Sequence, residues 1–342
     1  MNELQHSFTV RVGALLAGLC QILATELQVG TRLDEVRGFF RREYSLSKPY
    51  QSASFDIPFW LFSGSTMVTN EMIRLTSDDP SRQGLLWNTV PVMIRDWELE
   101  VAFAVRGKTG TLYGDGLAIW YTKDPGQPGP VFGSKDFFKG LAVFIDTYTN
   151  HPDAHNHAHP YVSAMINNGS LHYDHDRDGT HTQLGGHEKG CTSYFRNKDH
   201  PTRILVRYVG EILSVYMDVR NEGIWDHCFT VPNVILPLNY HFGFSAATGD
   251  LTDNHDIIGV KVYEIEYHRA ERENYDANKV EPNAEKVSAP RDHIDDNPPP
   301  SRLSSLRTGF LFVMALVVVA VVIVVGVIFI QQQQENRRKR FY

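Results

Sequence analysis

WELEVAFAV, residues Trp97–Val105, alternates large apolar side chains with polar or small ones, which is typical of a half-buried β-strand. Because successive side chains of a strand point to opposite faces, one set faces the core: Trp97, Leu99, Val101 and Phe103. The other set is acidic and is expected to face water: Asp96, Glu98 and Glu100. Such carboxylates also suggest the acid pair of a sandwich-fold glycoside hydrolase. The alternation explains them without catalysis, so no enzyme activity is predicted.

Seven further segments resemble this one, because most are short, alternate in polarity and are bounded by Gly, Asn, Asp or Pro. They are Leu117–Tyr121, Leu141–Ile145, Tyr161–Ile166, Ile204–Val209, Leu213–Asp218, Tyr240–Ser245 and Ile258–Tyr267. Between Ser52 and His268 no segment shows a convincing helical period, so βαβ units are not expected. The sequence therefore predicts an all-β domain, an antiparallel two-sheet β-sandwich.

Two apolar segments lie outside this domain. Val12–Ala24 (VGALLAGLCQILA) follows Arg11 and is too short to cross a bilayer. Residues 1–24 are therefore predicted to be a signal peptide, with an uncleaved anchor as the alternative. Gly309–Ile330 has 22 residues without a charge or a proline. That length suffices for one transmembrane helix across a hydrocarbon core of about 30 Å.

Composition and charge assign the remaining segments. Residues 271–308 are rich in charge, Asn and Pro and poor in large apolar side chains, so they are predicted to be a stalk. Residues 331–342 carry four basic residues, and the positive-inside rule places this tail in the cytosol. Residues 25–270 then form the lumenal domain of a single-pass type I membrane protein. A tail of 12 residues has no room for an effector domain, which argues against a signalling receptor.

Charge and cysteine content narrow the function further. The net charge of −7 includes the basic tail, so the lumenal part is more acidic still, which argues against nucleic acid as a partner. Cys20 lies in the predicted signal peptide, which leaves Cys191 and Cys228. In an oxidising lumen this pair is predicted to form a disulfide that stabilises the fold by about 3–4 kcal/mol. A zinc site is the alternative, but no CxxC pair accompanies these cysteines.

Three polar clusters could carry chemistry: Tyr113–Gly116, Phe144–Asn150 and Tyr173–Gly179. The third contains DHDRDG, which is similar to half of an EF-hand calcium loop, but Gly185 stands where the glutamate of that loop is expected. Taken singly, each cluster is explained by a polar turn.

The second cluster nevertheless has the donors of a calcium site. Calcium binds through about six to eight oxygens from carboxylates, carbonyls, amides and water. Asp146, the backbone carbonyl of Tyr148 and Asn150 can converge on one ion where the chain leaves a strand. Asp178, from a distant loop, would complete the protein ligands.

Several motifs occur together along nearly the whole chain: Tyr44–Tyr50 (YSLSKPY), Gly64–Thr66 (GST), Gly114–Tyr121 (GDGLAIWY), Pro130–Lys135 (PVFGSK), Asn167–Ser170, Gly249–Ile257 (GDLTDNHDI) and the terminal KRFY. In this combination the chain resembles the vesicular integral membrane lectins of the early secretory pathway, which belong to the legume-type (L-type) lectin superfamily. The resemblance implies a legume-lectin-like jelly roll that carries a calcium site beside a shallow mannose pocket.

Carried over residue by residue, the resemblance places calcium at Asp146, Tyr148 (by its carbonyl), Asn150 and Asp178. It places the sugar at Ser81, Asp115, Tyr148, Asn150, His175, Gly249, Asp250 and Leu251. The Asp115 carboxylate can accept hydrogen bonds from two hydroxyls of a pyranose. The Asn150 amide can donate to the sugar while its oxygen holds calcium, so the ion orients a sugar ligand. His175 could reach a further mannose and add pH sensitivity.

The function implied by the resemblance is a calcium-dependent lectin for high-mannose N-glycans, acting as a cargo receptor for sorting, transport or retention of glycoproteins. The alternative is a lectin-like quality-control chaperone that recognises polypeptide as well as glycan. The tail implies both retrieval and export by coat proteins, through a basic and an aromatic group: Arg338, Lys339, Arg340, Phe341 and Tyr342. The expected location is the membrane of the endoplasmic reticulum, the ER–Golgi intermediate compartment or the Golgi.

Two segments beside the inferred calcium site depart from the family's usual residues. The first contains four histidines: His151, His155, His157 and His159. Transition-metal binding is one interpretation of this loop, and a solvated loop is the simpler one. The second is the Gly-rich segment Leu184–Gly190.

Asn168 begins the sequon Asn-Gly-Ser and is expected to be glycosylated in this compartment.

Overall fold

The computed structural model describes residues 38–52, 56–108, 110, 113–150, 157–267 and 280–284, together with positions 324, 326, 327 and 330. All of its strands belong to the first of two compact units, residues 1–291, and the second unit is residues 292–342. The predicted signal peptide and cytosolic tail lie outside the described residues. The predicted transmembrane segment contributes four described positions, all helical. Within the described part of the chain, no helix is long and apolar enough to cross a membrane.

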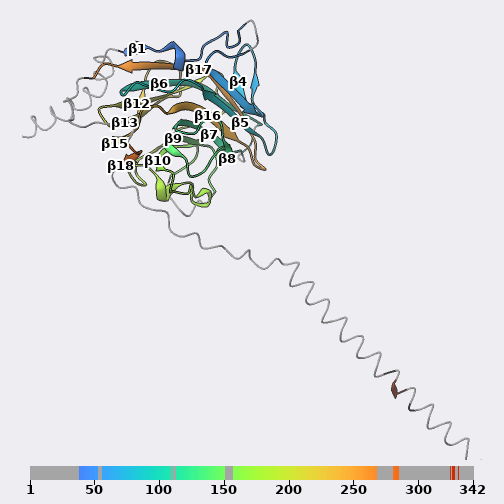
Figure 1. The fold of residues 1–342 in the computed structure, drawn as a ribbon. Helices are drawn as coiled ribbons and strands as arrows, with labels where there is room; N and C mark the ends of the chain where they lie inside the picture. The colour runs from blue at the N-terminus through green and yellow to red at the C-terminus, as the bar shows by residue number, and fades with distance from the viewer. Residues whose placement is uncertain are drawn as a thin grey trace, which may run out of the picture. The chain divides into compact units, whose positions relative to one another are not determined.

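Two antiparallel sheets form a β-sandwich, as the sequence predicts (Figure 1). The eight-stranded sheet contains, in spatial order, β14 (Asp226–Val231), β13 (Ile212–Asp218), β12 (Thr202–Val209), β6 (Trp97–Arg106), β17 (Asn254–Ile265), β4 (Ile73–Thr76) and β3 (Met67–Val68), with β1 (Gly38–Phe40) paired to β17. The seven-stranded sheet contains β11 (Cys191–Thr192), β10 (Tyr161–Asn168), β9 (Lys139–Asp146), β7 (Gly116–Thr122), β16 (His241–Ala247), β5 (Gln83–Asn88) and β2 (Trp60–Gly64). The remaining described elements within residues 38–284 are short: β8 (Pro128–Val131), β15 (Val234–Ile235), β18 (Asn283–Ala284), and the 3-10 turns η1 (Arg42–Tyr44), η2 (His175–Arg177) and η3 (Thr180–Thr182).

All eight predicted strands are present, as β6, β7, β9, β10, β12, β13, β16 and β17. Two of the strands that the sequence pattern did not reveal lack a clean alternation. β5 is buried continuously from Gly84 to Asn88 because both of its faces are covered. β2 is exposed after Trp60, since it lies at the edge of its sheet. Period-two patterning is therefore absent from both, for opposite reasons.

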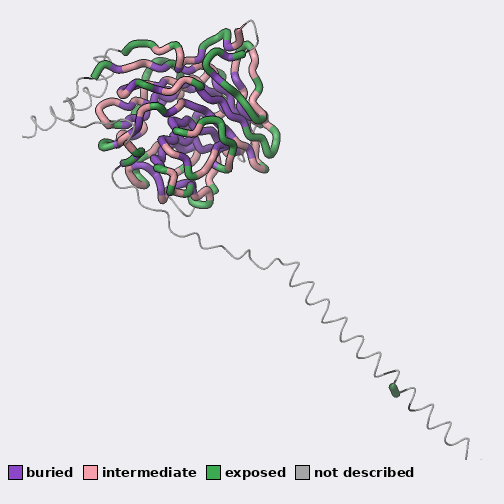
Figure 2. Tube along the Cα trace, in the orientation of Figure 1, coloured by how far each residue is buried: buried purple, intermediate pink, exposed green. Residues whose placement is uncertain are grey.

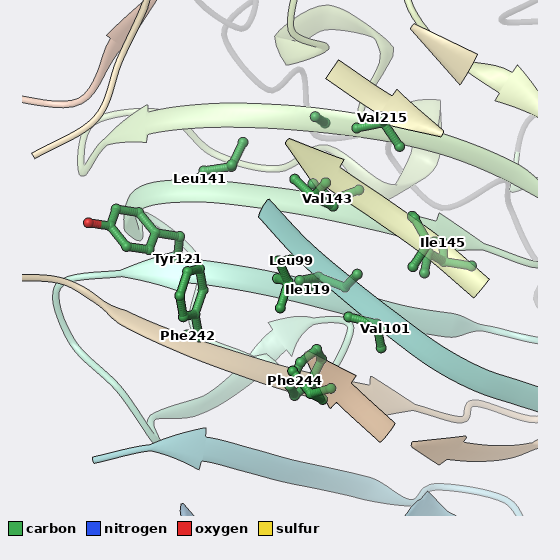
Figure 3. Close-up of a cluster of buried hydrophobic side chains, with 14 of the residues drawn as sticks. Leu99, Val101, Ile119, Tyr121, Leu141, Val143, Ile145, Val215, Phe242 and Phe244 are labelled. Atoms are coloured by element: carbon green, nitrogen blue, oxygen red, sulfur yellow. The ribbon is translucent and has the colours of Figure 1, made fainter. Parts of the chain in front are cut away.

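The hydrophobic core lies between the two sheets, where Figure 2 shows most of the buried chain. Leu99 and Val101 of β6 face Ile119 of β7 and Phe244 of β16 across this layer (Figure 3). Trp97 begins the same row, and its ring centroid lies 5.0 Å from that of Phe242 in an edge-to-face contact. The predicted core face of β6 is thus confirmed.

The acidic face of the same strand differs from the expectation that it lies in water. Asp96 is only 7% exposed, and its carboxylate accepts a hydrogen bond of 2.7 Å from the Gly210 N–H. That prediction is wrong for Asp96, because the β12–β13 turn folds over it. Glu98 and Glu100 do lie outside the core, but they are half-buried against cross-strand arginines: Arg207 lies 3.8 Å from Glu98 and Arg203 lies 3.4 Å from Glu100. These three acids thus have structural partners.

The disulfide between Cys191 and Cys228 is present, which confirms that prediction. Cys191 lies in β11 and Cys228 in β14, and these are edge strands of different sheets. The bond therefore links the two sheets at one side of the sandwich.

A short strand follows the last strand of the sandwich. β18 lies within residues 271–308, the expected stalk, and pairs with β15 through the registers Val234–Ala284 and Ile235–Asn283. Ala284 is 7% exposed and belongs to the main core cluster. Asn283 and Ala284 are therefore part of the packed domain.

Candidate functional site

Four strand ends meet at one edge of the seven-stranded sheet. Gly116 pairs with Asp146 on β9 and with Ala247 on β16, and Ala247 also pairs with Gln83 on β5. Asp115 directly precedes the first of these residues, and its carbonyl accepts a hydrogen bond of 3.0 Å from the Thr147 N–H. The register alone therefore brings together residues that lie far apart in the sequence.

Asp178 reaches this edge on a separate loop. The loop is held by Tyr173, whose ring lies 4.6 Å from that of Phe144 on the outer face of β9. Gly179 follows with a φ of +64°, and a Cβ there would lie 2.3 Å from the Tyr173 ring, so only glycine fits. The Asp178 carboxylate then accepts hydrogen bonds from the Asn150 N–H at 2.9 Å and the Thr149 hydroxyl at 3.4 Å.

The carboxylates at this edge repel one another. Burial is the main cause that raises the pKa of Asp115 to about 6, and the charges of Asp146 and Asp250 add to it. Burial also raises the pKa of Asp146 to about 6, with a contribution from Asp178 that His159 opposes. A cation between these groups would remove the cost of their ionisation, so the arrangement fits a divalent metal ion.

The predicted calcium ligands are brought together in part by these contacts. Asp146 and Asp178 have carboxylate oxygens within 4.8 Å of one another and of an imidazole nitrogen of His159. The Tyr148 N–H donates a hydrogen bond of 3.0 Å to Oδ1 of Asp146, which fixes the orientation of that carboxylate. Asn150 is exposed and lies beside Asp178 through its backbone N–H. The oxygen-rich donor set fits calcium.

His159 is a residue of this site that the sequence did not assign to it. The solvated-loop interpretation is wrong for this histidine, because its side chain is only 5% exposed and its Nε2 lies 3.8 Å from Oδ2 of Asp146. It is also wrong for His157, whose two ring nitrogens are buried and whose ring stacks on Tyr161 at 3.5 Å. His151 and His155 lie outside the described residues. The sequence signal that could have indicated His159 was the run of four histidines just before β10.

The residues predicted to bind sugar mostly converge beside the carboxylates. A Cβ at Gly249 would lie 3.4 Å from both carboxylate oxygens of Asp115, so the main chain there faces that side chain. The Ser81 N–H donates a hydrogen bond of 3.0 Å to the Gly249 carbonyl. Tyr148 and Leu251 line the opposite side of the same turn, since both lie within 3.5 Å of a Cβ built on Gly114.

His175 packs against aromatic side chains. Its ring contacts Tyr173 at 4.7 Å and Phe132 at 5.9 Å, and its Nε2 is buried. Burial lowers the pKa of His175, although a hydrogen bond with the Pro130 carbonyl opposes the shift. Its described contacts are thus with the aromatic cluster that supports the Asp178 loop.

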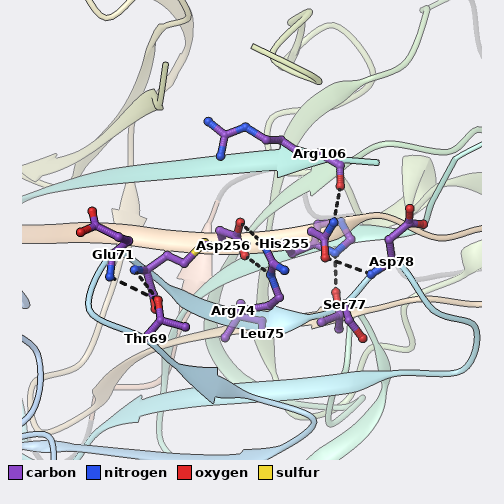
Figure 4. A network of polar contacts seen from close by, with 12 residues as sticks. Thr69, Glu71, Arg74, Leu75, Ser77, Asp78, Arg106, His255 and Asp256 are labelled. Atoms are coloured by element: carbon purple, nitrogen blue, oxygen red, sulfur yellow. Dashed lines mark hydrogen bonds and ion pairs between the residues drawn. The ribbon is translucent and has the colours of Figure 1, made fainter. Parts of the chain in front are cut away.

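Polar contacts join the loop before β5 to the start of β17 and to β6, and Figure 4 shows the part of this network that reaches Asp78 and Arg106. Asn254 donates to the Arg106 carbonyl at 3.0 Å and accepts from the Asp78 N–H at 3.1 Å. The Thr248 hydroxyl donates to the Asp79 carbonyl at 2.7 Å. These contacts fix the Ser81 loop against the Gly249 loop.

A buried ion pair attaches the Asp115 turn to the same loops. Arg196 donates to both carboxylate oxygens of Asp253, at 2.8 Å to each, and its guanidinium lies 4.1 Å above the Tyr113 ring. Asp253 is fully buried. Arg196 therefore connects the turn before β7 with the loop before β17.

A two-sheet sandwich with an acidic cage and an adjoining shallow turn at one sheet edge has the architecture of a legume-type lectin. Comparison with known proteins agrees with this class: the family model "Legume-like lectin family" matches residues 37–272. The chain belongs to the legume-like lectin family.

Individual relatives cover most of the chain. The vesicular integral-membrane protein VIP36 of Canis lupus familiaris is 48% identical over 260 residues, which is 75% of this chain and 71% of the canine protein. The VIP36-like protein of Mus musculus is 45% identical over 307 residues, or 89% of this chain and 86% of the mouse protein. Among solved structures, the VIP36 exoplasmic/lumenal domain in its Ca2+/Man3GlcNAc-bound form has a TM-score of 0.67 and 47% identity, covering 72% of this chain and all of that domain.

Proposed function

We propose that this protein is a calcium-dependent lectin for high-mannose N-glycans that acts as a cargo receptor for glycoproteins in the early secretory pathway. The observation that carries the proposal is the convergence of Asp115, Asp146 and Gly249 at adjoining strand ends. The VIP36 lumenal domain has been solved with Ca2+ and Man3GlcNAc, and it shares 47% identity with this chain. The proposed activity is binding, without a catalytic step.

The proposed calcium ligands are the carboxylates of Asp146 and Asp178, the Tyr148 carbonyl and the Asn150 side chain. Calcium would supply a positive charge that keeps the two carboxylates ionised and holds the loop from Tyr148 to Asn150 in one conformation. Asn150 could then present its amide N–H to a sugar hydroxyl. The raised pKa of Asp146 supports this role, because a buried carboxylate without a cation resists ionisation.

The proposed sugar site adjoins this cage. Asp115 would accept hydrogen bonds from two hydroxyls, and the backbone from Gly249 to Leu251 would donate others. The full set consists of Ser81, Asp115, Tyr148, Asn150, His175, Gly249, Asp250 and Leu251. All eight assignments stay predictions, and the described ring contacts of His175 are with Phe132 and Tyr173.

The proposed membrane arrangement keeps the sequence-based boundaries for the ends of the chain. A signal peptide at residues 1–24, one membrane-spanning helix at 309–330 and a cytosolic tail would place the lectin domain in the lumen. The basic and aromatic residues from Arg338 to Tyr342 would contact coat proteins. Relatives named as vesicular integral-membrane proteins support this location. Asn168 is exposed at the end of β10, as a glycosylated asparagine must be.

A glycan array probed with the purified full chain, with and without calcium, tests the proposal. We expect binding to high-mannose structures that chelation abolishes. Asp115→Ala should weaken it more than about tenfold, because hydrogen bonds to a charged group contribute about 1.5–3 kcal/mol. Asn150→Ala should weaken it as well, because it removes both a calcium ligand and a sugar donor of the proposed site. Asp226→Ala, on the exposed start of β14, is the matched control and should bind normally. Undiminished binding after chelation would exclude the proposed site, and equal capture of deglycosylated cargo would favour a chaperone instead.

A further inference from the structure

Residues 280–284 form a strap that lies beside the expected glycosylation site at the end of β10. Within the strap, β18 pairs with β15 and lies close to β10. Glu281 adds an ion pair with Lys139 at 3.6 Å, and Lys139 is the residue of β9 that pairs with Asn168. The strap therefore meets the domain where β10 ends and the sequon begins.

The described contacts of the strap are weak ones. β15 and β18 form a separate two-stranded sheet with two residues in each strand, and so small a sheet is marginally stable by itself. The side chains of Lys139 and Glu281 are 37% and 65% exposed, so their ion pair contributes little. A segment held in this way opens readily unless a further group covers it.

Two cavities lie along the strap, and Asn168 lines both of them. The smaller has a volume of about 200 Å³, and its walls include Leu171. The larger has a volume of about 410 Å³, and its walls include Glu211. Pro282 and Asn283 line both cavities, so each lies where Asn168 meets the strap.

The walls of these cavities suit a sugar ring. Leu171 and Pro282 offer apolar contact to the C–H groups of a pyranose, and Asn283 and Glu211 offer polar groups to its hydroxyls. A ring attached to Asn168 would reach these walls without the entropic cost of binding from solution, because it is already tethered at their common border.

The Asn168 side chain is oriented for such an attachment. Its Oδ1 accepts hydrogen bonds from the Ser170 N–H at 3.1 Å and from the Ser170 hydroxyl at 2.6 Å. Both bonds use the amide oxygen, whereas an N-linked glycan is attached to the amide nitrogen. Asn168 is exposed, so a glycan can be accommodated there.

We propose that the first GlcNAc of the Asn168 glycan packs against the walls of the two cavities and holds the strap on the domain. This inference rests on the glycosylation of Asn168 that the proposed function includes. The contact is separate from sugar recognition, because Tyr161, at the other end of β10, pairs with Asp146 of the candidate site. At about 3.3 Å per residue, β10 separates Asn168 from that site by about 23 Å.

Hydrogen exchange tests the inference on the full chain, produced in cells that attach high-mannose glycans and purified in detergent. Mass spectrometry first establishes whether Asn168 carries the glycan, and exchange is then followed in the peptide that covers the strap. Ser170→Ala removes the sequon, and Ser170→Thr is the matched control because it preserves the sequon. We expect the strap to exchange at least about fivefold faster in Ser170→Ala and at the wild-type rate in Ser170→Thr.

Enzymatic trimming separates direct contact from shielding by the outer sugars. Wild-type protein trimmed to the single GlcNAc on Asn168 should keep the slow exchange of the strap, whereas complete removal of the glycan should give the rate of Ser170→Ala. Equal exchange in glycosylated wild type and Ser170→Ala would overturn the inference. So would a loss of protection on trimming to one GlcNAc, or an unmodified Asn168.

The same samples keep this inference distinct from the proposed function. All forms should bind high-mannose glycans alike in the presence of calcium, since the strap lies at the other end of β10 from the candidate site. Absence of calcium-dependent binding in every form would contradict the lectin function, while the exchange rates of the strap would still decide the role of the Asn168 glycan.

Discussion

The backbone of Gly249 lies directly against the carboxylate of Asp115, such that a Cβ at position 249 would lie 3.4 Å from each of its two oxygens. Any side chain beyond Cβ would therefore occupy the space over that carboxylate. Gly249 has no positive φ, so backbone strain does not demand glycine here. A sugar bound over Asp115, as proposed, would need the space that a longer side chain at position 249 would fill.

The first prediction follows from this contact. Gly249→Leu should abolish binding to a high-mannose glycan, whereas Gly249→Ala should weaken it less, because a Cβ at 3.4 Å makes an ordinary van der Waals contact. Neither change should alter calcium affinity. Glycan binding by surface plasmon resonance and calcium titration of the same samples check this. Gly259→Ala, whose Cβ would meet only the Leu46 carbonyl at 3.7 Å, is the control. Normal glycan binding by Gly249→Leu would place the sugar elsewhere.

The second prediction concerns acid. In the metal-free folded protein the pKa of Asp146 is about 6, above the value of about 3.9 in an unfolded chain. Between these values the folded state binds more protons than the unfolded state, so this group makes the metal-free protein more stable as the pH falls from 7 toward 4. The gain is about 2 kcal/mol. Calcium requires the ionised form, so its stabilising effect should shrink over the same range.

Denaturant unfolding at several pH values, with wild-type protein compared with Asp146→Asn, isolates that contribution. The comparison is needed because His255 acts in the opposite direction. Burial lowers the pKa of His255 to about 3. Below about pH 6.5 the unfolded chain therefore binds a proton at this residue that the folded chain does not bind, and this lowers the stability of the fold. As the pH falls, the free energy of unfolding of wild type should rise relative to that of Asp146→Asn. Any advantage of the variant at neutral pH should therefore narrow or reverse. A difference that does not change with pH would contradict the raised pKa.

The sequence predicted the sandwich well because its central strands are amphipathic. Trp97–Val105 alternates and is buried on one face only, so its period-two pattern was visible. β5 is buried on both faces and β2 is an exposed edge, so neither has the pattern, and their positions depend on tertiary pairing. The prediction that Asp96 faces water was wrong for the same kind of reason, since only the fold shows that the turn at Gly210 covers this side chain.

The candidate site was predictable where its proposed calcium ligands are close in sequence. Asp146, Tyr148 and Asn150 follow one strand end, and their oxygen donors suggest calcium from the residues alone. Asp178 lies 28 residues beyond Asn150 and was assigned through resemblance to the lectins, a position that the contact between Asn150 and Asp178 now supports. His159 was missed because a His-rich loop in a sequence does not show which ring is buried against which carboxylate.

The third prediction addresses the ion pair behind the pocket. Arg196→Met leaves the fully buried Asp253 carboxylate without its partner and should destabilise the domain by about 3–5 kcal/mol. Arg220→Met is the matched control, because its pair with Glu222 at 3.5 Å is exposed and contributes about 0–1 kcal/mol. Thermal unfolding of both variants checks the difference. Addition of Asp253→Asn to Arg196→Met should recover part of the lost stability, since it removes the unpaired charge. Equal unfolding temperatures for Arg196→Met, Arg220→Met and the double variant would contradict the role of the buried ion pair.

The last prediction concerns where the folded domain ends. Ala284 is 7% exposed and pairs with Val234, although it lies in a segment whose composition resembles a linker. Ala284→Asp would bury an unpaired carboxylate and should lower the free energy of unfolding by about 2 kcal/mol or more. Asn283→Asp introduces the same charge at the adjacent, exposed position and should change it by less than about 0.5 kcal/mol. Urea unfolding of the two variants separates burial from charge, and equal midpoints would show that β18 does not contribute to the stability of the sandwich. A loss confined to Ala284→Asp would mean that any lectin fragment must include β18, because a fragment ending at residue 270 exposes the surface of Val234 that Ala284 covers.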